Sequence, residues 1–179
     1  MRIIGGKYKG KKLFSPVSDN VRPTSDRARE ALFNIMRSRL GHDFSSLKFI
    51  DVFSGSGAMG LEALSQGVAK VVLVDLDTKD LQKNVKLFEC EKEKIEVVKT
   101  DITKSILLND KFDVVFMDAP YNKGLSEIAL QKVAEYLKHG TFCMIEVAKN
   151  ETCNLPTNYR LLDERNYGVA KVIIAEFIS

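Results

Sequence analysis

Hydrophobic residues recur along this chain at two spacings, one typical of helices and the other of buried strands. Over about 26–40 they follow helical spacing, with Ser25 placed to cap the first turn and Gly41 to end the helix. Continuous apolar runs predict strands over 48–53, 70–75, 95–99, 112–118 and 141–147. Segments of helical character lie between them, over 58–66, 78–89, 103–108 and 125–138, with Gly140 as the last stop signal. This alternation predicts an α/β fold with a parallel sheet and helices on both faces.

The end of the chain departs from this alternation. Segments 159–165 and 169–178 both look like strands, yet only a tight turn containing Gly168 separates them. So short a connection joins antiparallel strands only. The sheet should therefore be mostly parallel and finish with an antiparallel strand.

The first 24 residues predict a small β-hairpin followed by a loop rich in turn-forming residues. We therefore divide the chain into an N-terminal extension over 1–24 and a main α/β domain over 25–179. The two parts should form effectively one structural domain, because 179 residues suit a single core.

Composition narrows the class of protein. Apolar residues make up 45% of the chain and charged residues 28%, which is ordinary for a soluble domain. No apolar stretch is long enough to span a membrane, and no signal peptide is evident, so we expect a cytoplasmic protein. The three cysteines have no metal-binding spacing and only two histidines are present, so we expect no metal site.

Basic residues are concentrated at the N-terminus. Residues 1–40 hold ten Lys and Arg against three acids, a net charge of +7, and the remaining residues carry a net charge of −4. Such a basic segment on a mildly acidic body suits a polyanionic partner, although a solvated charged face has the same composition.

A glycine-rich loop follows the first predicted strand and opens a helix. Gly55, Gly57 and Gly60 fit the pattern G-x-G-x-x-G, and Asp75 lies 20 residues beyond Gly55 at the end of the second strand. At this spacing a carboxylate meets the vicinal hydroxyls of a ribose, so the motif predicts an adenosine-type cofactor. A tightly packed structural loop is the alternative.

Two features favour S-adenosylmethionine over a dinucleotide as that cofactor. Asp51 ends the strand before the glycines, where its carboxylate can reach the amino group of a methionine moiety, and the terminal antiparallel hairpin is foreign to dinucleotide folds. Asp101, after the third strand, suits an adenine amino group, although an exposed turn acid is an equal reading. The predicted cofactor contacts are Asp51, Phe53, Ser54, Gly55, Gly57, Asp75, Leu76, Asp101 and Ile102.

The fourth strand runs into the tetrapeptide Asp118-Ala119-Pro120-Tyr121. An exocyclic amine of a base attacks a sulfonium methyl only as its nitrogen becomes tetrahedral and loses a proton, and hydrogen-bond acceptors favour that change. Asp118 supplies one acceptor and the carbonyl of Ala119 another, whose direction Pro120 restricts. Tyr121 offers a flat ring for a flipped base. On its own, an Asp-x-Pro turn at a strand end would explain the same residues.

With these motifs in order, the chain resembles the bacterial RsmD family, the 16S ribosomal RNA guanine-N2 methyltransferases, over nearly its whole length. Ala119 departs from the family pattern, because the loop there usually reads Asp-Pro-Pro-Tyr. The resemblance is carried by the blocks Arg2–Lys7, Arg22–Glu30 with Leu32–Asn34, Asp51–Leu64 and Asp118–Tyr121.

The resemblance implies a class I methyltransferase (Rossmann-like) fold with a seven-stranded sheet, and S-adenosylmethionine as the methyl donor. It also implies one guanine of 16S rRNA as the target, in the assembled or assembling small subunit, with no metal, and we expect a monomer. Thr24 and Arg27 are placed to contact either RNA or the active site. The predicted RNA contacts are Arg2, Lys7, Lys9, Lys11, Lys12, Arg22, Thr24 and Arg27.

Three other classes of protein share parts of the pattern. An NAD-dependent oxidoreductase would fit the glycines but needs a second catalytic domain or a proton relay, for which the chain has little room. A non-enzymatic RNA-binding module would leave the Asp118 loop without a purpose. DNA adenine and protein amide methyltransferases use similar loops, but Asp118 in place of Asn and the Arg22–Glu30 block favour rRNA guanine.

Overall fold

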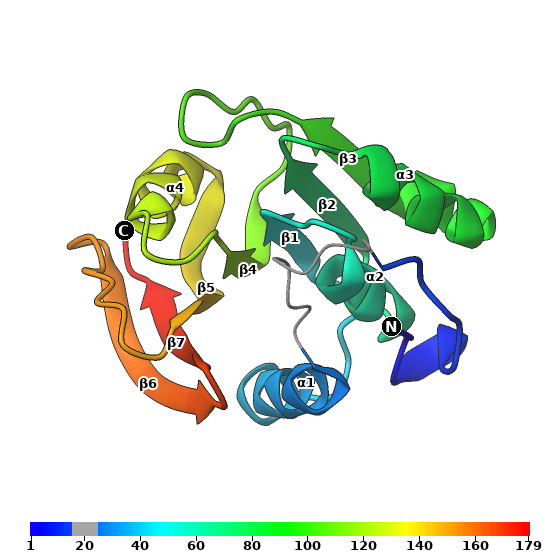
Figure 1. The fold of residues 1–179 in the computed structure, drawn as a ribbon, viewed down its shortest axis with the longest axis horizontal. Coiled ribbons are helices and arrows are strands. Elements are labelled where there is room, and N and C mark those ends of the chain that lie inside the picture. Colours follow the sequence, from blue (N-terminus) through cyan, green and yellow to red (C-terminus); the bar gives the residue numbers. More distant parts are fainter. Residues whose placement is uncertain (16–24) are drawn as a thin grey trace.

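The computed structural model describes residues 1–15 and 25–179, so Arg22 and Thr24 lie outside the described residues. Seven strands of this part form one sheet in the order β3-β2-β1-β4-β5-β7-β6 (Figure 1). The strands are β1 (Lys48–Val52), β2 (Lys70–Asp75), β3 (Ile95–Lys99), β4 (Phe112–Asp118), β5 (Leu137–Ala148), β6 (Tyr159–Tyr167) and β7 (Ala170–Phe177). The helices are α1 (Asp26–Leu40), α2 (Ala58–Ser65), α3 (Lys79–Val85) and α4 (Leu125–Val133), with 3-10 segments η1 (Gly6–Tyr8), η2 (Lys86–Lys94) and η3 (Ala134–Tyr136).

The sheet has the predicted direction of strands. Strands β1 to β5 pair in parallel, and β7 runs antiparallel to both β5 and β6. The strand order reverses beside β1, since the chain first builds outward to β3 and then returns to β4 on the other side. In open α/β sheets, ligands bind at the carboxyl ends of the strands at such a reversal.

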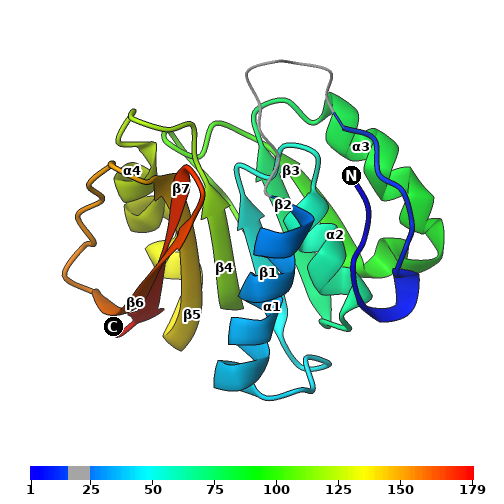
Figure 2. The same ribbon diagram turned by 60° about the horizontal axis from the view of Figure 1, so that its bottom comes forward.

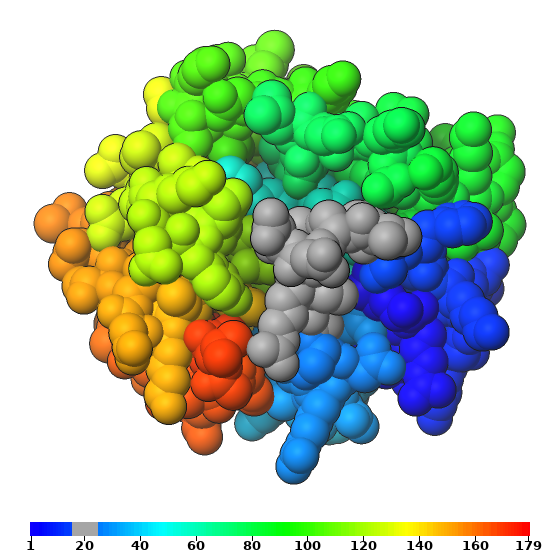
Figure 3. Space-filling view, viewed as in Figure 1, coloured from blue at the N-terminus to red at the C-terminus, as the bar shows by residue number. Residues whose placement is uncertain are grey.

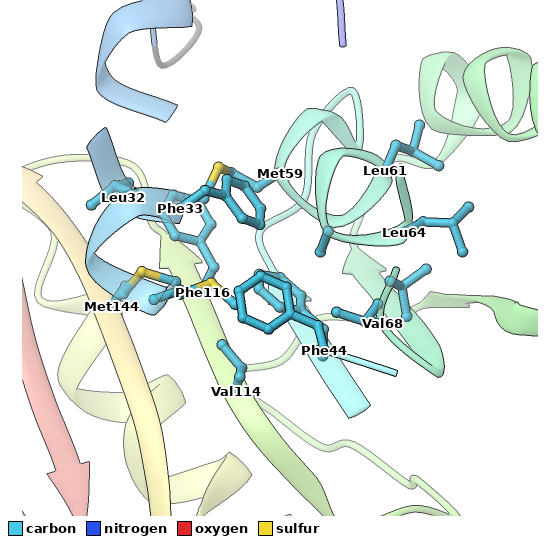
Figure 4. Close-up of a cluster of buried hydrophobic side chains, with 14 of the residues drawn as sticks. Leu32, Phe33, Phe44, Met59, Leu61, Leu64, Val68, Val114, Phe116 and Met144 are labelled. Carbon is cyan, nitrogen blue, oxygen red and sulfur yellow. The ribbon is translucent and has the colours of Figure 1, made fainter. Parts of the chain in front are cut away.

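Helices cover both faces of the sheet, as predicted (Figure 2). On one face, α1 and α2 pack over the central strands, and Phe33, Met59, Phe116 and Met144 meet in the close-up of that core (Figure 4). On the opposite face, α4 buries apolar side chains such as Leu130 against the same strands. The central strands are apolar on both sides because both sides are covered.

Helix α1 begins and ends where the sequence predicts. The Ser25 side chain accepts a hydrogen bond from the Ala28 N–H, and Gly41 has a φ of 88°, which favours glycine as a helix terminator. Between these two signals, Leu32, Phe33 and Met36 are buried on one side of the helix.

The N-terminal segment forms a short version of the predicted hairpin, in which the Ile3 N–H donates to the Lys11 carbonyl at 2.9 Å and the Leu13 N–H donates to the Met1 carbonyl at 3.0 Å. Arg2 and Lys12 form a single antiparallel bridge, and the turn between them contains η1. The Glu62 carboxylate of α2 accepts the N–H groups of Ile4 and Gly5, both at 2.8 Å, so these groups do not pair across a hairpin. A Cβ on Gly6 would lie 1.8 Å from the Ser65 carbonyl oxygen, which shows how closely this segment approaches α2.

Three predicted helices also need correction. No helix forms over 103–108, where the Asp101 carbonyl accepts the N–H groups of Lys104 and Ser105 and the chain makes turns. The helix predicted over 78–89 instead changes to 3-10 geometry after Val85 and continues as η2. The helix predicted over 125–138 ends at Val133 and gives way to η3.

Gly140 lies inside β5 rather than at a helix end. Leu137 pairs with Phe112 and Phe142 pairs with Val114, so the segment between Leu137 and Phe142 bulges from the ladder. Gly140 takes a φ of 84° there, a conformation that glycine adopts readily. A bulge glycine and a helix-stopping glycine look alike in sequence.

In the described part of the chain, no helix has the length and apolar character needed to cross a membrane.

Replacing Glu62 with Ala leaves the Ile4 and Gly5 N–H groups without acceptors. We expect the free energy of unfolding to fall by roughly 1–3 kcal/mol, because two partly buried donors lose a charged partner. Urea unfolding of Glu62→Ala should be compared with Glu93→Ala, an exposed residue of η2. Equal unfolding midpoints for the two variants would show that Glu62 does not hold the N-terminal segment.

Candidate active site

Four carboxylates gather on one face of the sheet, at the carboxyl ends of adjacent strands. The strand registers pair Asp51 with Leu73 and Phe116, and pair Asp118 with Glu146. Because side chains two residues apart point to the same face, Asp75 and Asp118 share the face of Asp51. Among the described residues, no three His, Cys, Asp or Glu are arranged as ligands of a metal ion.

The glycine loop joins β1 to α2 in a tight turn. The Gly57 N–H donates to the Ser54 carbonyl at 2.7 Å, and Gly57 has a φ of 78°. A Cβ on Gly57 would lie 2.4 Å from the Leu81 side chain, and one on Gly60 would lie 2.2 Å from Leu73. These two glycines therefore allow α2 to pack directly against its neighbours.

The loop also contains groups that no described residue engages. The Ser54 hydroxyl is buried and has no hydrogen-bond partner among the described residues. A Cβ on Gly55 would meet nothing within 4 Å, so there is space beside this backbone. Phe53 has a φ of 60°, a strained value for a residue with a side chain. A free hydroxyl beside open backbone and local strain fits a ligand-binding loop.

Asp75 at the end of β2 faces this loop. One of its oxygens accepts the Gly55 N–H at 2.7 Å and the other accepts the Asp77 N–H at 3.0 Å. A carboxylate oxygen can accept more than one hydrogen bond, so both remain able to bind vicinal hydroxyls. Leu76 follows with 65% of its side chain exposed and offers an apolar surface next to that carboxylate.

Asp51 is more deeply buried than the other three carboxylates. It is 1% exposed and accepts the Gly60 N–H at 2.9 Å. Burial raises the pKa of Asp51 to about 7, against the lowering effect of the Gly60 hydrogen bond. One oxygen is therefore engaged with α2, while the carboxyl group as a whole sits directly beneath the glycine loop.

Asp101 makes the contacts of a turn residue. Its carboxylate accepts the N–H and the hydroxyl of Thr103, and the hydroxyl contact in particular lowers the pKa of Asp101. Lys104 adds an ion pair at 3.4 Å. Ile102 is 2% exposed and belongs to the core cluster on the α4 side of the sheet.

The loop after β4 presents a free acceptor. Asp118 is half-buried, and no described residue donates a hydrogen bond to its carboxylate. Burial, followed by the charges of Glu146 and Asp51, raises the pKa of Asp118 well above its ordinary value. Ala119 is buried behind it and Pro120 is exposed. The Tyr121 hydroxyl donates to the Glu146 carboxylate at 2.8 Å.

Several predicted RNA-binding residues already have partners within the protein. Lys7 forms an ion pair with Glu91, Lys11 donates to the Leu87 carbonyl at 2.6 Å, and Arg2 pairs with Asp26 at 3.2 Å. The dark-blue N-terminal segment accordingly packs against the green α3–η2 region (Figure 3). Among the described residues, the predicted RNA contacts that are exposed and have no such partner are Lys9, Lys12 and Arg27.

Glu146 was missed by the sequence reasoning. It is a single acid near the end of the apolar strand predicted over 141–147, and Met144, two residues earlier, is in the core. Because strand side chains alternate between faces, the sequence places Glu146 on the same face as Met144. It does not show which strand lies next to β5 on that side. The neighbour could be identified only from the sheet order.

Comparisons with known proteins show what this chain is similar to. Residues 1–176 match the model of a family described as conserved hypothetical protein 95. The ribosomal RNA small subunit methyltransferase D of Haemophilus influenzae is 34% identical over 177 residues, which cover 94% of this chain and 90% of that protein.

Solved structures have the same fold. The Escherichia coli protein yhhF, described as a candidate methyltransferase, superposes with a TM-score of 0.84 at 28% identity, covering 100% of this chain and 98% of that one. A Thermus thermophilus 16S rRNA N2 G1207 methyltransferase in complex with AdoMet and guanosine superposes with a TM-score of 0.64. It is 19% identical and covers 90% of this chain and 44% of that one, so it shows the fold alone.

Proposed function

This chain belongs to the conserved hypothetical protein 95 family, and we propose that it methylates the exocyclic N2 amine of a guanine in small-subunit ribosomal RNA. It is a methyltransferase, as the name shared by its relatives states, and the resemblance seen in the sequence is confirmed. The observation that carries the proposed reaction is the Asp118 carboxylate, which accepts no hydrogen bond from the described residues and lies at the end of β4, beside the point where the strand order reverses.

S-adenosylmethionine is the proposed methyl donor, and when bound it supplies an electrophilic methyl group on a sulfonium centre. We assign Asp75 to its ribose hydroxyls. The loop that contains Ser54 and Gly55 would contact the cofactor through its backbone. Leu76 would lie against the adenosine part. The unpartnered Ser54 hydroxyl and the space beside Gly55 support this assignment. Asp51, beneath the loop, would meet the amino group of the methionine part directly or through water.

The remaining groups act on the target base. The Asp118 carboxylate would accept a hydrogen bond from the amine, and the Ala119 carbonyl would accept the second. As the nitrogen becomes tetrahedral, these acceptors stabilise the positive charge that develops on it. The ring of Tyr121 would stack against the base, which must leave its RNA stack to reach this position. Low exposure around Asp118 strengthens these interactions, because water screens them less.

The RNA partner would meet the protein across its N-terminal segment. Lys9, Lys12 and Arg27 are the exposed cations that remain available there, among the described residues, while Lys7 and Lys11 help to hold the segment in place. Phosphate contacts of this kind orient the substrate and carry no sequence information. Recognition of one guanine would therefore depend on contacts with groups such as Asp118 and Tyr121.

Replacing Asp118 with Ala should lower the rate of methyl transfer about 100-fold or more, because the amine loses its charged acceptor. The affinity for S-adenosylmethionine should stay unchanged, since the assigned cofactor contacts come from other strands. Methyl transfer to small subunits and calorimetry with the cofactor measure the two quantities. Asp80→Ala, in the first turn of α3, is the control, and wild-type turnover in Asp118→Ala would refute the mechanism.

Asp75→Ala should weaken S-adenosylmethionine binding by about 1–3 kcal/mol, because the ribose hydroxyls lose their acceptor. Asp77→Ala is the matched control, since its side chain accepts a hydrogen bond only two residues away, from the Lys79 N–H. Calorimetry on the protein without RNA measures both variants. Binding of NADH in place of S-adenosylmethionine would overturn the cofactor assignment.

Lys9→Ala combined with Lys12→Ala should weaken binding to small subunits and reduce its salt dependence, by close to one unit of slope for each phosphate that the protein no longer neutralises. Cofactor affinity should not change. The exposed Lys132 of α4 provides a control substitution away from this segment. An unaltered salt slope would mean that the two lysines are solvated and that another surface holds the RNA.

A further inference from the structure

Glu146 occupies a position that the reaction as described above does not use. It lies on β5 directly beside Asp118 of β4, and beside Val172 of β7 on the other side. The residue is only 5% exposed. An ionised carboxylate is costly to bury, so a buried glutamate next to the proposed acceptor calls for a physical account.

One contact of Glu146 acts on Tyr121, whose ring is proposed to stack against the base. Its carboxylate accepts the Tyr121 hydroxyl at 2.8 Å, which ties the loop after β4 to β5. The neighbouring loop residues Asn122, Lys123 and Gly124 are exposed, and Asn122 has a φ of 58°. A ring anchored at its hydroxyl keeps its orientation although the backbone around it is open to solvent. The hydrogen bond therefore holds the hydroxyl end of the ring, and with it the long axis of the ring, against β5.

A second effect of Glu146 acts on Asp118. Among the described residues, the titratable groups that act on Asp118 are Glu146 on β5 and Asp51 on β1. Burial and the charge of Asp118 in turn raise the pKa of Tyr121 in its own loop. Burial and the charges of the two carboxylates raise the pKa of Asp118, with burial as the larger cause. A carboxylate with a raised pKa holds a proton more strongly, which makes it a better acceptor for a proton leaving an amine.

We propose that Glu146 is a positioning residue of the methyl transfer: it orients the Tyr121 ring and strengthens Asp118 as the proton acceptor. The inference rests on the proposed function. In the step, the guanine nitrogen forms a bond to the methyl carbon, and the electron pair of the carbon–sulfur bond stays on sulfur. One amine proton passes to the Asp118 carboxylate and then to water, so charge and atoms balance.

Three variants separate the two effects. Glu146→Gln removes the charge but keeps an oxygen that accepts the Tyr121 hydroxyl. The acid limb of its pH–activity profile should have a midpoint about one pH unit below that of the wild type, because Asp118 then ionises at lower pH. Tyr121→Phe keeps the ring and the charge but removes the donor. It should raise KM for the small subunit about fivefold, the effect of losing one hydrogen bond near 1 kcal/mol.

Glu146→Ala removes both the charge and the acceptor, so it should show the two changes together. Glu164→Gln, on exposed β6, is the control for the removal of a carboxylate. Cofactor affinity and thermal unfolding report whether each variant is folded. If Glu146→Ala fails to fold, Glu146→Gln and Tyr121→Phe still decide the question. An acid limb in Glu146→Gln that superposes on the wild type, or an unchanged KM in Tyr121→Phe, overturns the proposal.

A measurement without activity separates this inference from the proposed function. Carboxyl-carbon NMR of protein with isotope-labelled aspartates follows the ionisation of Asp118, whose signal Asp118→Asn identifies. The midpoint should fall by about one pH unit in Glu146→Gln. A protein that methylates no RNA but shows this shift would refute the proposed function and retain the electrostatic coupling. An unchanged midpoint would refute the coupling itself.

Discussion

The register of four adjacent parallel strands, β2, β1, β4 and β5, determines what this molecule can do. Each strand fills the core with apolar side chains and then carries a carboxylate on the same face near its carboxyl end. A shift of one residue in any pair would turn that carboxylate to the opposite face and an apolar residue into the site. The continuous apolar packing of the strands therefore also fixes the positions of the acids.

Crowding these acids has an electrostatic cost, which the fold offsets with backbone N–H groups. Gly60 donates to Asp51, and Gly55 donates to Asp75. Asp118 receives no such donor from the described residues, so no hydrogen bond from them lowers its raised pKa. Its carboxylate is therefore available to a substrate. The contrast distinguishes the carboxylates that build the loop from the one that is free to react. Strain at Phe53 and a buried Ser54 hydroxyl with no partner among the described residues lie in the same region and fit the proposed cofactor site.

Much of the fold could be predicted because the signals are local. The bounds of β2, β3 and β4 agree with the sequence prediction, since buried parallel strands are apolar runs between polar residues. Helix α1 has unambiguous signals at Ser25 and Gly41. Gly140 could not be interpreted, because the bulge it serves depends on the pairing of β5 with β4. The N-terminal hairpin was predicted, but its short pairing could not be, since Glu62 of α2 takes the N–H groups of Ile4 and Gly5.

The candidate site shows the same division. Asp75, Asp118 and the glycines follow strand ends in a recognisable order, so sequence alone was enough to propose them. The partners of Lys7 and Lys11 are distant in sequence, on η2, and the contact between Glu146 and Tyr121 joins β5 to the loop after β4. Charge patterning could not separate lysines that hold the segment from those that face solvent.

The most direct test of the central claim is transfer of a labelled methyl group to small ribosomal subunits that lack the modification, followed by nucleoside analysis. The account predicts label in N2-methylguanosine of the small-subunit RNA, and none when the subunits already carry the modification. Label in an adenine derivative, or no transfer from S-adenosylmethionine at all, would contradict it.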